Sequence, residues 1–145
     1  MGAVVERLPF DSIDKLTRTY LVTVGLLYAL IGLTWIILPA GATRTAGVEW
    51  LHGIEPWMIG VAWIVAGCIA VLGRFHSGLT NTGFQALIAT PTLLASWFLI
   101  SWGLWIVSGG TIGAQRGIAT TISYATFAAA AYTIARVHVL SRRRQ

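Results

Sequence analysis

Residues 96–107 of this 145-residue chain read SWFLISWGLWIV, and this stretch decides the fold class. A helix built from these residues is apolar on almost every face, as is a helix built from residues 63–72, WIVAGCIAVL. The strands of a membrane β-barrel instead alternate apolar and polar residues over about ten positions. The two stretches therefore predict helices that lie in hydrocarbon.

Four segments of this kind are long enough, or nearly so, to cross a bilayer, which takes roughly 20 apolar helical residues. They cover residues 20–38, 56–72, 84–107 and 118–135, and none contains Asp, Glu, Lys, Arg or His. Helices satisfy their own backbone hydrogen bonds in lipid, and short connections make sequential helices antiparallel neighbours. We therefore expect an all-α fold, an integral membrane up-down four-helix bundle that forms a single domain over residues 1–145.

Two amphipathic stretches are expected outside these segments. A short helical lead-in before the first crossing is predicted by apolar residues on one face, Ile13, Leu16 and Tyr20, after a cap at Asp11 or Ser12. A short helix on the outer surface is predicted by Val48, Leu51 and Ile54. A competing interpretation takes Ala40 and Ala42 as a signal-peptidase site, but the acidic residues of the leading region and its long apolar run disfavour cleavage.

The composition supports a membrane location and the charges predict an orientation. The chain is 56% hydrophobic and 10% charged, with a mean hydropathy of +0.74 and a net charge of +5. So basic a soluble chain would suggest nucleic-acid binding, but here Lys and Arg concentrate on alternate loops, the pattern that membrane insertion produces. We therefore expect no nucleic acid as partner. Eight basic residues fall on one side (Arg7, Lys15, Arg18, Arg74, Arg136, Arg142, Arg143 and Arg144), against Arg44 and Arg116 on the other. The positive-inside rule then predicts a multi-pass protein of the bacterial cytoplasmic membrane with both termini in the cytoplasm.

Residues of two kinds are predicted to lie at the lipid interface. Five tryptophans fall near the predicted outer boundary, where indole rings anchor helices or, in a second interpretation, form a ligand site: Trp35, Trp50, Trp57, Trp102 and Trp105. At the other boundary, Arg142, Arg143 and Arg144 are expected to contact anionic headgroups, each worth about 1 kcal/mol. In a second, functional interpretation, the tail is that of a holin-like protein, because compact basic tails are common in phage holins.

Small residues at a spacing of four predict where helices pack closely, because lipid removes most of the hydrophobic drive between helices. The predicted packing residues are Gly25 and Ala29 in the first helix, Ala62, Ala66 and Ala70 in the second, and Gly117, Thr121, Ala125, Ala129 and Thr133 in the fourth. Such stripes serve either as seams within one bundle or as the interface of a homo-oligomer. Pro91 predicts a kink in the third helix, accommodated by Thr92 or Ser96 or used as a hinge.

Residues that would carry chemistry are sparse. Ion and proton pathways usually contain intramembrane ionisable residues, so a pump is disfavoured, although a path lined by the hydroxyls of Thr120, Thr121, Ser123 and Thr126 stays open. Glu49, His52 and Glu55 recur at a spacing of three, but a metal site would need a further ligand. Cys68, the one cysteine, is expected in the core. We expect no catalytic residue, no metal and no cofactor, and therefore not an enzyme.

The layout resembles that of small four-span membrane proteins of actinobacterial phages and prophages, which often lie beside lysis genes. The likeness covers nearly the whole chain and is carried by E-P-W at residues 55–57, G-F at 83–84, Pro91, and the tryptophans at 102 and 105. It implies a membrane-lysis or membrane-remodelling context and carries over no site. The leading hypothesis is thus a non-enzymatic, holin-like membrane protein. The alternatives are a small channel or transporter subunit for a neutral solute, and an anchor or regulatory subunit that binds a membrane partner protein.

Overall fold

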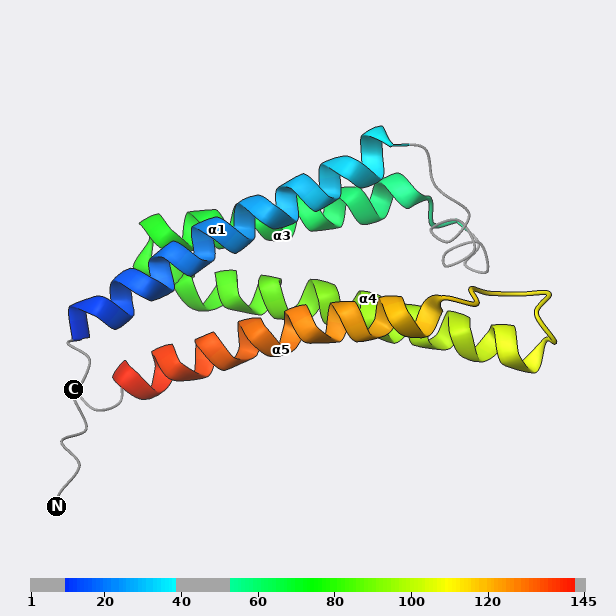
Figure 1. Cartoon of the computed structure of the whole chain (residues 1–145). Helices are drawn as coiled ribbons and strands as arrows, with labels where there is room; N and C mark the ends of the chain where they lie inside the picture. The colour runs from blue at the N-terminus through cyan, green and yellow to red at the C-terminus, as the bar shows by residue number, and fades with distance from the viewer. Residues whose placement is uncertain (1–9, 39–52, 143–145) are drawn as a thin grey trace, which may run out of the picture.

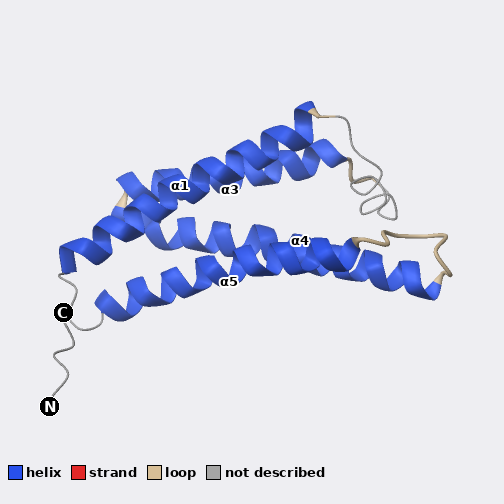
Figure 2. Cartoon of the chain, in the orientation of Figure 1, coloured by secondary structure: helices blue, strands red, loops and turns tan. Residues whose placement is uncertain are grey.

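The structure, a computed structural model, describes residues 10–38 and 53–142 and is all-α over these ranges (Figure 2). Its helices are α1 (Phe10–Ile37), α3 (Pro56–Phe75), α4 (Thr80–Val107) and α5 (Gly117–Arg142), and a 3-10 turn η1 (Ser77–Leu79) joins α3 to α4. All four long helices have the length and apolar composition needed to cross a membrane. The predicted all-α, four-helix membrane fold is therefore confirmed.

The helices extend beyond the predicted apolar segments, mainly at one end of the molecule. α1 begins at Phe10, so the amphipathic lead-in and the first crossing form one continuous helix, with an ion pair from Arg18 to Asp14 at 2.8 Å in the lead-in. α5 likewise continues past Ala135 to Arg142. Apolar composition locates the part of a helix that suits hydrocarbon, whereas hydrogen bonding and capping decide where the helix ends. The predicted surface helix at residues 48–54 lies largely outside the described residues.

The four helices run up and down as two antiparallel hairpins. The first turn of α1 and the last turn of α5 lie at the same end of the molecule (Figure 1). α1 packs along α3 and α4 packs along α5, while α3 and α4 join the two hairpins. Four basic residues of the described helices lie at the end where α1 starts: Lys15, Arg18, Arg74 and Arg136. We call this the basic end; Arg116 lies in the connection at the opposite end.

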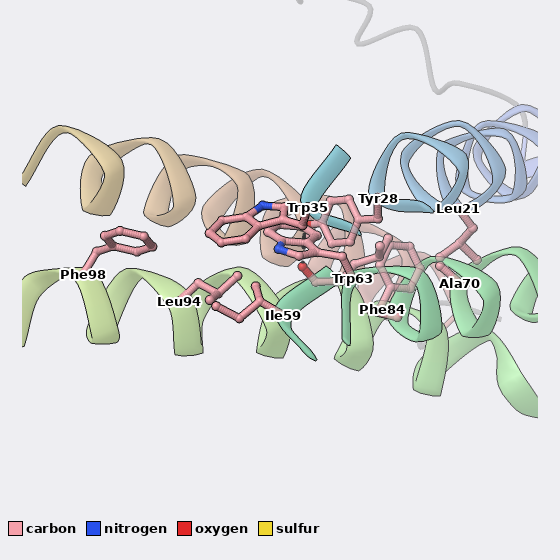
Figure 3. Close-up of a cluster of buried hydrophobic side chains, with 12 residues drawn as sticks. Leu21, Tyr28, Trp35, Ile59, Trp63, Ala70, Phe84, Leu94 and Phe98 are labelled. Carbon is pink, nitrogen blue, oxygen red and sulfur yellow. Dashed lines mark hydrogen bonds between the residues drawn. The ribbon is translucent and has the colours of Figure 1, made fainter. Parts of the chain in front are cut away.

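A chain of aromatic rings crosses the middle of the bundle and includes one ring from each helix. Tyr28 of α1 meets Trp63 of α3 edge-on, with ring centroids 4.5 Å apart. Trp63 lies 5.6 Å from Tyr124 of α5, which lies 5.8 Å from Phe98 of α4. Tyr28, Trp63 and Phe98 are among the largest fully buried side chains, and Figure 3 shows them within the apolar cluster. Aromatic packing therefore fills the interior where the two hairpins meet.

Candidate functional site

Two pairs of glycines bring the backbones of α1 and α3 into contact. A Cβ atom added at Gly60 would lie 2.7 Å from the carbonyl oxygen of Gly32, and one added at Gly25 would lie 2.8 Å from that of Gly67. Predicted Gly25 therefore lies in this seam, and the backbone nitrogen of Ala29 lies close to Gly67. A spacing of four does not identify the other three glycines. The missed signal is a spacing of seven, which occurs once in each helix and matches in antiparallel register.

The three alanines predicted to form one stripe on α3 do not share an environment. Ala66 and Ala70 are buried, whereas Ala62 is exposed. Ala70 lies between two helices, because a Cβ at Gly25 of α1 would contact its side chain at 3.2 Å and a Cβ at Gly83 of α4 would lie 3.2 Å from its Cα. A stripe with spacing four turns around a helix by about 40° per step, so it leaves a straight seam within a few turns.

The predicted stripe of α5 turns around its helix in the same way, so its residues do not all face the same neighbour. Gly117 packs on α4, because an added Cβ would lie 2.7 Å from the carbonyl oxygen of Phe98. Thr121 also faces α4 and donates a hydrogen bond to the carbonyl of Ala95 at 3.2 Å. Ala125 and Ala129 are exposed. Of the predicted α5 residues, the first part of the stripe contacts α4 and the later part faces outward.

α5 is the helix that its neighbours cover least. Only 11% of its apolar segment is buried, against 28% to 39% in the other three helices. Exposed small residues lie on its outward side at alternating spacings of four and three, and we call them the outer stripe: Ala119, Ser123, Thr126, Ala130 and Thr133. Exposed Val137 and Leu140 continue the same spacing toward the basic end. From Ala119 to Leu140 a helix rises about 32 Å, close to the thickness of a bilayer core.

The hydroxyls of α5 are satisfied mainly by α5 itself. Ser123 donates to the carbonyl of Ala119 at 3.0 Å, Thr126 to that of Ile122 at 2.8 Å, and Thr120 to that of Arg116 at 3.3 Å. Such back-bonding satisfies the hydroxyl donor and reduces the cost of placing the hydroxyl against lipid. Of the four hydroxyls predicted to line a path, Thr121 also bonds to α4, while exposed Ser123 and Thr126 face out of the bundle. A hydroxyl-lined path through these residues would have to form between chains.

A tyrosine from α1 satisfies the carbonyl that Pro91 leaves unpaired in α4. Pro91 has no N–H, so the carbonyl of Leu87, four residues earlier, loses its helical donor. The buried hydroxyl of Tyr28 donates to this carbonyl at 2.9 Å. Thr92 bonds to the next carbonyl, that of Ile88, at 2.7 Å. The local hydroxyls named from the sequence therefore act within α4, and the residue that compensates Pro91 comes from another helix.

The predicted interfacial residues occupy different positions. Trp57 is exposed and its indole N–H donates to the carboxylate of Glu55 at 2.6 Å, which suits a polar boundary. Trp102 and Trp105 are half-buried near the same end of the molecule. Trp35 is only 5% exposed and belongs to the interior cluster, so its indole faces other helices and not the surrounding lipid. Trp50, Arg143 and Arg144 lie outside the described residues, and Arg142 is the last residue of α5.

The residues considered for metal binding and redox chemistry do not assemble into a described site. Glu49 and His52 lie outside the described residues, and Glu55 pairs with Trp57. Across residues 10–38 and 53–142, no three His, Cys, Asp or Glu side chains lie together as a potential metal site. Cys68 is exposed on α3, so the prediction of a core position was wrong. Its apolar neighbours in sequence are equally consistent with a helix face turned toward lipid.

Comparison of the chain with protein-family models, with curated proteins and with solved structures finds no match. The outer stripe of α5, which lies on the least covered helix, is the candidate functional surface.

Proposed function

We propose that this chain is a non-enzymatic protein of a bacterial cytoplasmic membrane, of bacterial or phage origin, that self-associates through α5 and permeabilises the membrane as holins do. One observation carries the proposal: small, exposed residues follow the outward side of α5 from Ala119 to Thr133, about 21 Å of helix, and exposed Val137 and Leu140 continue their spacing toward the basic end. In lipid, helices associate where small residues let their backbones approach, because the hydrophobic drive between them is weak. The outer stripe has this property on the least covered helix.

The spacing of the outer stripe favours a second copy of the same helix as its neighbour. Alternation of four and three residues keeps a seam on one side of a helix when two helices wrap around each other at a small angle. Two copies in one membrane, related by an axis along the membrane normal, present identical stripes at the same depth. Ala130 would then lie near its own counterpart. A third or fourth copy around the same axis would keep every stripe facing that axis, as in coiled coils of more than two strands.

The basic end supports a cytoplasmic position for both ends of the described chain. Lys15, Arg18, Arg74 and Arg136 are placed at this end, and Arg116 at the other. Lys and Arg near helix ends bias insertion so that the richer side stays in the cytoplasm. This orientation belongs to the proposal, and reporter fusions to the two ends of the chain would test it.

Controlled expression in a bacterium with a potential-sensitive dye tests the proposed function. The unaltered chain is expected to dissipate the membrane potential above a threshold of expression and to migrate as an oligomer in mild detergent. Ala130→Leu places a bulky, lipid-compatible side chain on the outer stripe and should abolish both effects. Ala62→Leu makes the same change on the exposed side of α3 and should preserve both. An intact potential at high expression would overturn the proposal.

A second candidate is a channel subunit for a small neutral solute, favoured by the hydroxyls on the outer stripe. Ser123, Thr126 and Thr133 are exposed, and each hydroxyl retains acceptor capacity after donating to its own helix. Between associated copies these oxygens would line a polar path. Solute flux into liposomes, reduced by replacing the three hydroxyl residues with alanine while the membrane stays impermeable to ions, would favour this function over permeabilisation.

A further inference from the structure

We infer that a groove between α4 and α5 at the basic end binds the phosphate headgroup of an anionic phospholipid. The groove has a volume of about 520 Å³ and lies between the first turns of α4 and the last turns of α5. This inference goes beyond the proposed function and holds whether or not the chain permeabilises membranes.

The polar part of the groove suits a phosphate. Its lining contains the guanidinium of Arg136 and the side-chain amides of Asn81 and Gln85, and it contains no carboxylate. Arg136 supplies a fixed positive charge, and the amides supply N–H donors for phosphate oxygens. Arginine is also more weakly hydrated than lysine, which favours its use against phosphate at a partly dry boundary.

Contacts along α5 hold the guanidinium of Arg136 in place. Its Nη1 donates to the hydroxyl of Tyr132 at 3.2 Å, and its central carbon lies 5.8 Å from the centre of the Tyr132 ring. Both residues line the groove. Within the part of the chain that the structure describes, the other N–H groups of Arg136 have no acceptor and no carboxylate pairs with it. A positioned but unneutralised cation is therefore available to an anion.

The apolar part of the groove selects a lipid over free phosphate. Ile88 of α4 and Ala135 of α5 also line it, and both lie within the apolar runs of their helices. Gln85 and Arg136 lie next to the ends of the apolar runs 84–107 and 118–135, so the groove spans the polar boundary of the membrane. A phospholipid places its phosphodiester at this depth and its acyl chains alongside the apolar residues. Inorganic phosphate would gain nothing from those apolar residues.

A second groove at the basic end lacks these properties. It is smaller, about 240 Å³, and lies between α1 and α3. Asp14 lines it and pairs with Arg18 at 2.8 Å, while Lys15 and Arg74 supply two further positive charges. A phosphate there would lie beside a carboxylate, and no apolar residue lines this groove to contact the acyl chains of a lipid. The α4 and α5 groove is thus favoured as the lipid site.

Native mass spectrometry of the full chain in detergent, with added phosphatidylglycerol, phosphatidylcholine or inorganic phosphate, tests this inference. Phosphatidylglycerol should bind at least about fivefold more tightly than phosphatidylcholine, the preference that one arginine gives at about 1 kcal/mol. Arg136→Gln should remove this preference. Arg116→Gln, which makes the same charge change at the opposite end, should preserve it.

A second variant keeps the test independent of charge and folding. Gln85→Leu changes no charge, lies on the other helix of the groove, and should weaken phosphatidylglycerol binding by about twofold to fivefold. Equal binding of the two lipids, or an equal loss in Arg136→Gln and Arg116→Gln, would overturn the inference. Displacement of the lipid by millimolar inorganic phosphate would also overturn it, because the site would then recognise phosphate without its lipid.

Discussion

Removing the hydrogen bond from the Tyr28 hydroxyl to the carbonyl of Leu87 tests whether this polar contact stabilises the bundle in addition to the packing of the Tyr28 ring. Tyr28→Phe keeps the ring that packs 4.5 Å from Trp63 and removes only the hydroxyl. Hydrogen bonds inside membrane bundles contribute about 0.6 kcal/mol on average and up to about 1.7 kcal/mol. The carbonyl of Leu87 is a costly acceptor to leave alone, because Pro91 cannot donate to it. We therefore expect the free energy of unfolding to fall by about 1 to 2 kcal/mol.

Reversible unfolding in mixed detergent micelles, followed by tryptophan fluorescence, measures this loss. Tyr20→Phe is the matched control, since Tyr20 lies on the same helix and its hydroxyl makes no hydrogen bond to the described residues. Its ring stacks on Phe84 at 6.2 Å, a contact that phenylalanine retains. The control should change the unfolding free energy by less than about 0.5 kcal/mol.

A double-mutant cycle with Pro91→Ala identifies the cause of the loss. Alanine at this position restores an N–H that can donate to the carbonyl of Leu87 within α4. In that background, Tyr28→Phe should cost less than about 0.5 kcal/mol, because the carbonyl keeps a donor when the hydroxyl is absent. An equal cost of Tyr28→Phe in both backgrounds would refute the reasoning, since the hydroxyl would then act independently of the proline.

Two further predictions concern the seams of the bundle and use the same unfolding measurement. Gly60→Ala should lower the unfolding free energy by about 1 to 3 kcal/mol, because the new methyl group would lie 2.7 Å from the backbone oxygen of Gly32, whereas Gly103→Ala, with no atom within 4 Å, should be neutral or slightly stabilising. An equal effect at the two glycines would contradict close backbone packing. Ser101→Ala should cost about 1 to 2 kcal/mol and speed hydrogen exchange at the amide of Ala114, which donates to the buried Ser101 hydroxyl at 3.1 Å. Ser96→Ala provides the control, because the exposed Ser96 hydroxyl donates to the carbonyl of Thr92 in its own helix, and equal losses would contradict a specific contribution of the Ser101 hydrogen bond.

The number and approximate position of the helices follow from the sequence because lipid imposes one strong condition. A backbone in hydrocarbon must be helical, so apolar runs such as 63–72 and 96–107 predict crossings directly. The ends of the helices are harder to predict, since α1 and α5 continue into polar residues at Lys15 and Arg136. Lipid requires a helix within the hydrocarbon, but it does not make the helix end at the polar boundary. The local hydrogen bonds at its ends decide that point.

The faces of the helices follow from the sequence only in part, because small residues occur on several sides of each helix. The stripes with a spacing of four include Gly25, Ala66 and Ala70, which are buried, and also Ala62 and Ala129, which are exposed. Which residues of a helix become buried depends on where the neighbouring helix lies, and the spacing of residues along one helix does not give that position. The hydroxyl donor for the carbonyl freed by Pro91 illustrates this, since Tyr28 lies 59 residues away along the chain.

Both candidate functions are assigned to one surface, the exposed side of α5, because the interior of the bundle is packed. Rings from all four helices fill the middle of the bundle, so a polar path through one chain would have to separate Tyr28 from Trp63 and Tyr124 from Phe98. A path between chains would leave these contacts intact and would use the hydroxyls of the outer stripe. On the proposal that copies associate through α5, permeabilisation and solute conduction would therefore both depend on this one surface. Ala130→Leu should therefore keep the fold and lose the activity of the chain, whether that activity is permeabilisation or solute conduction.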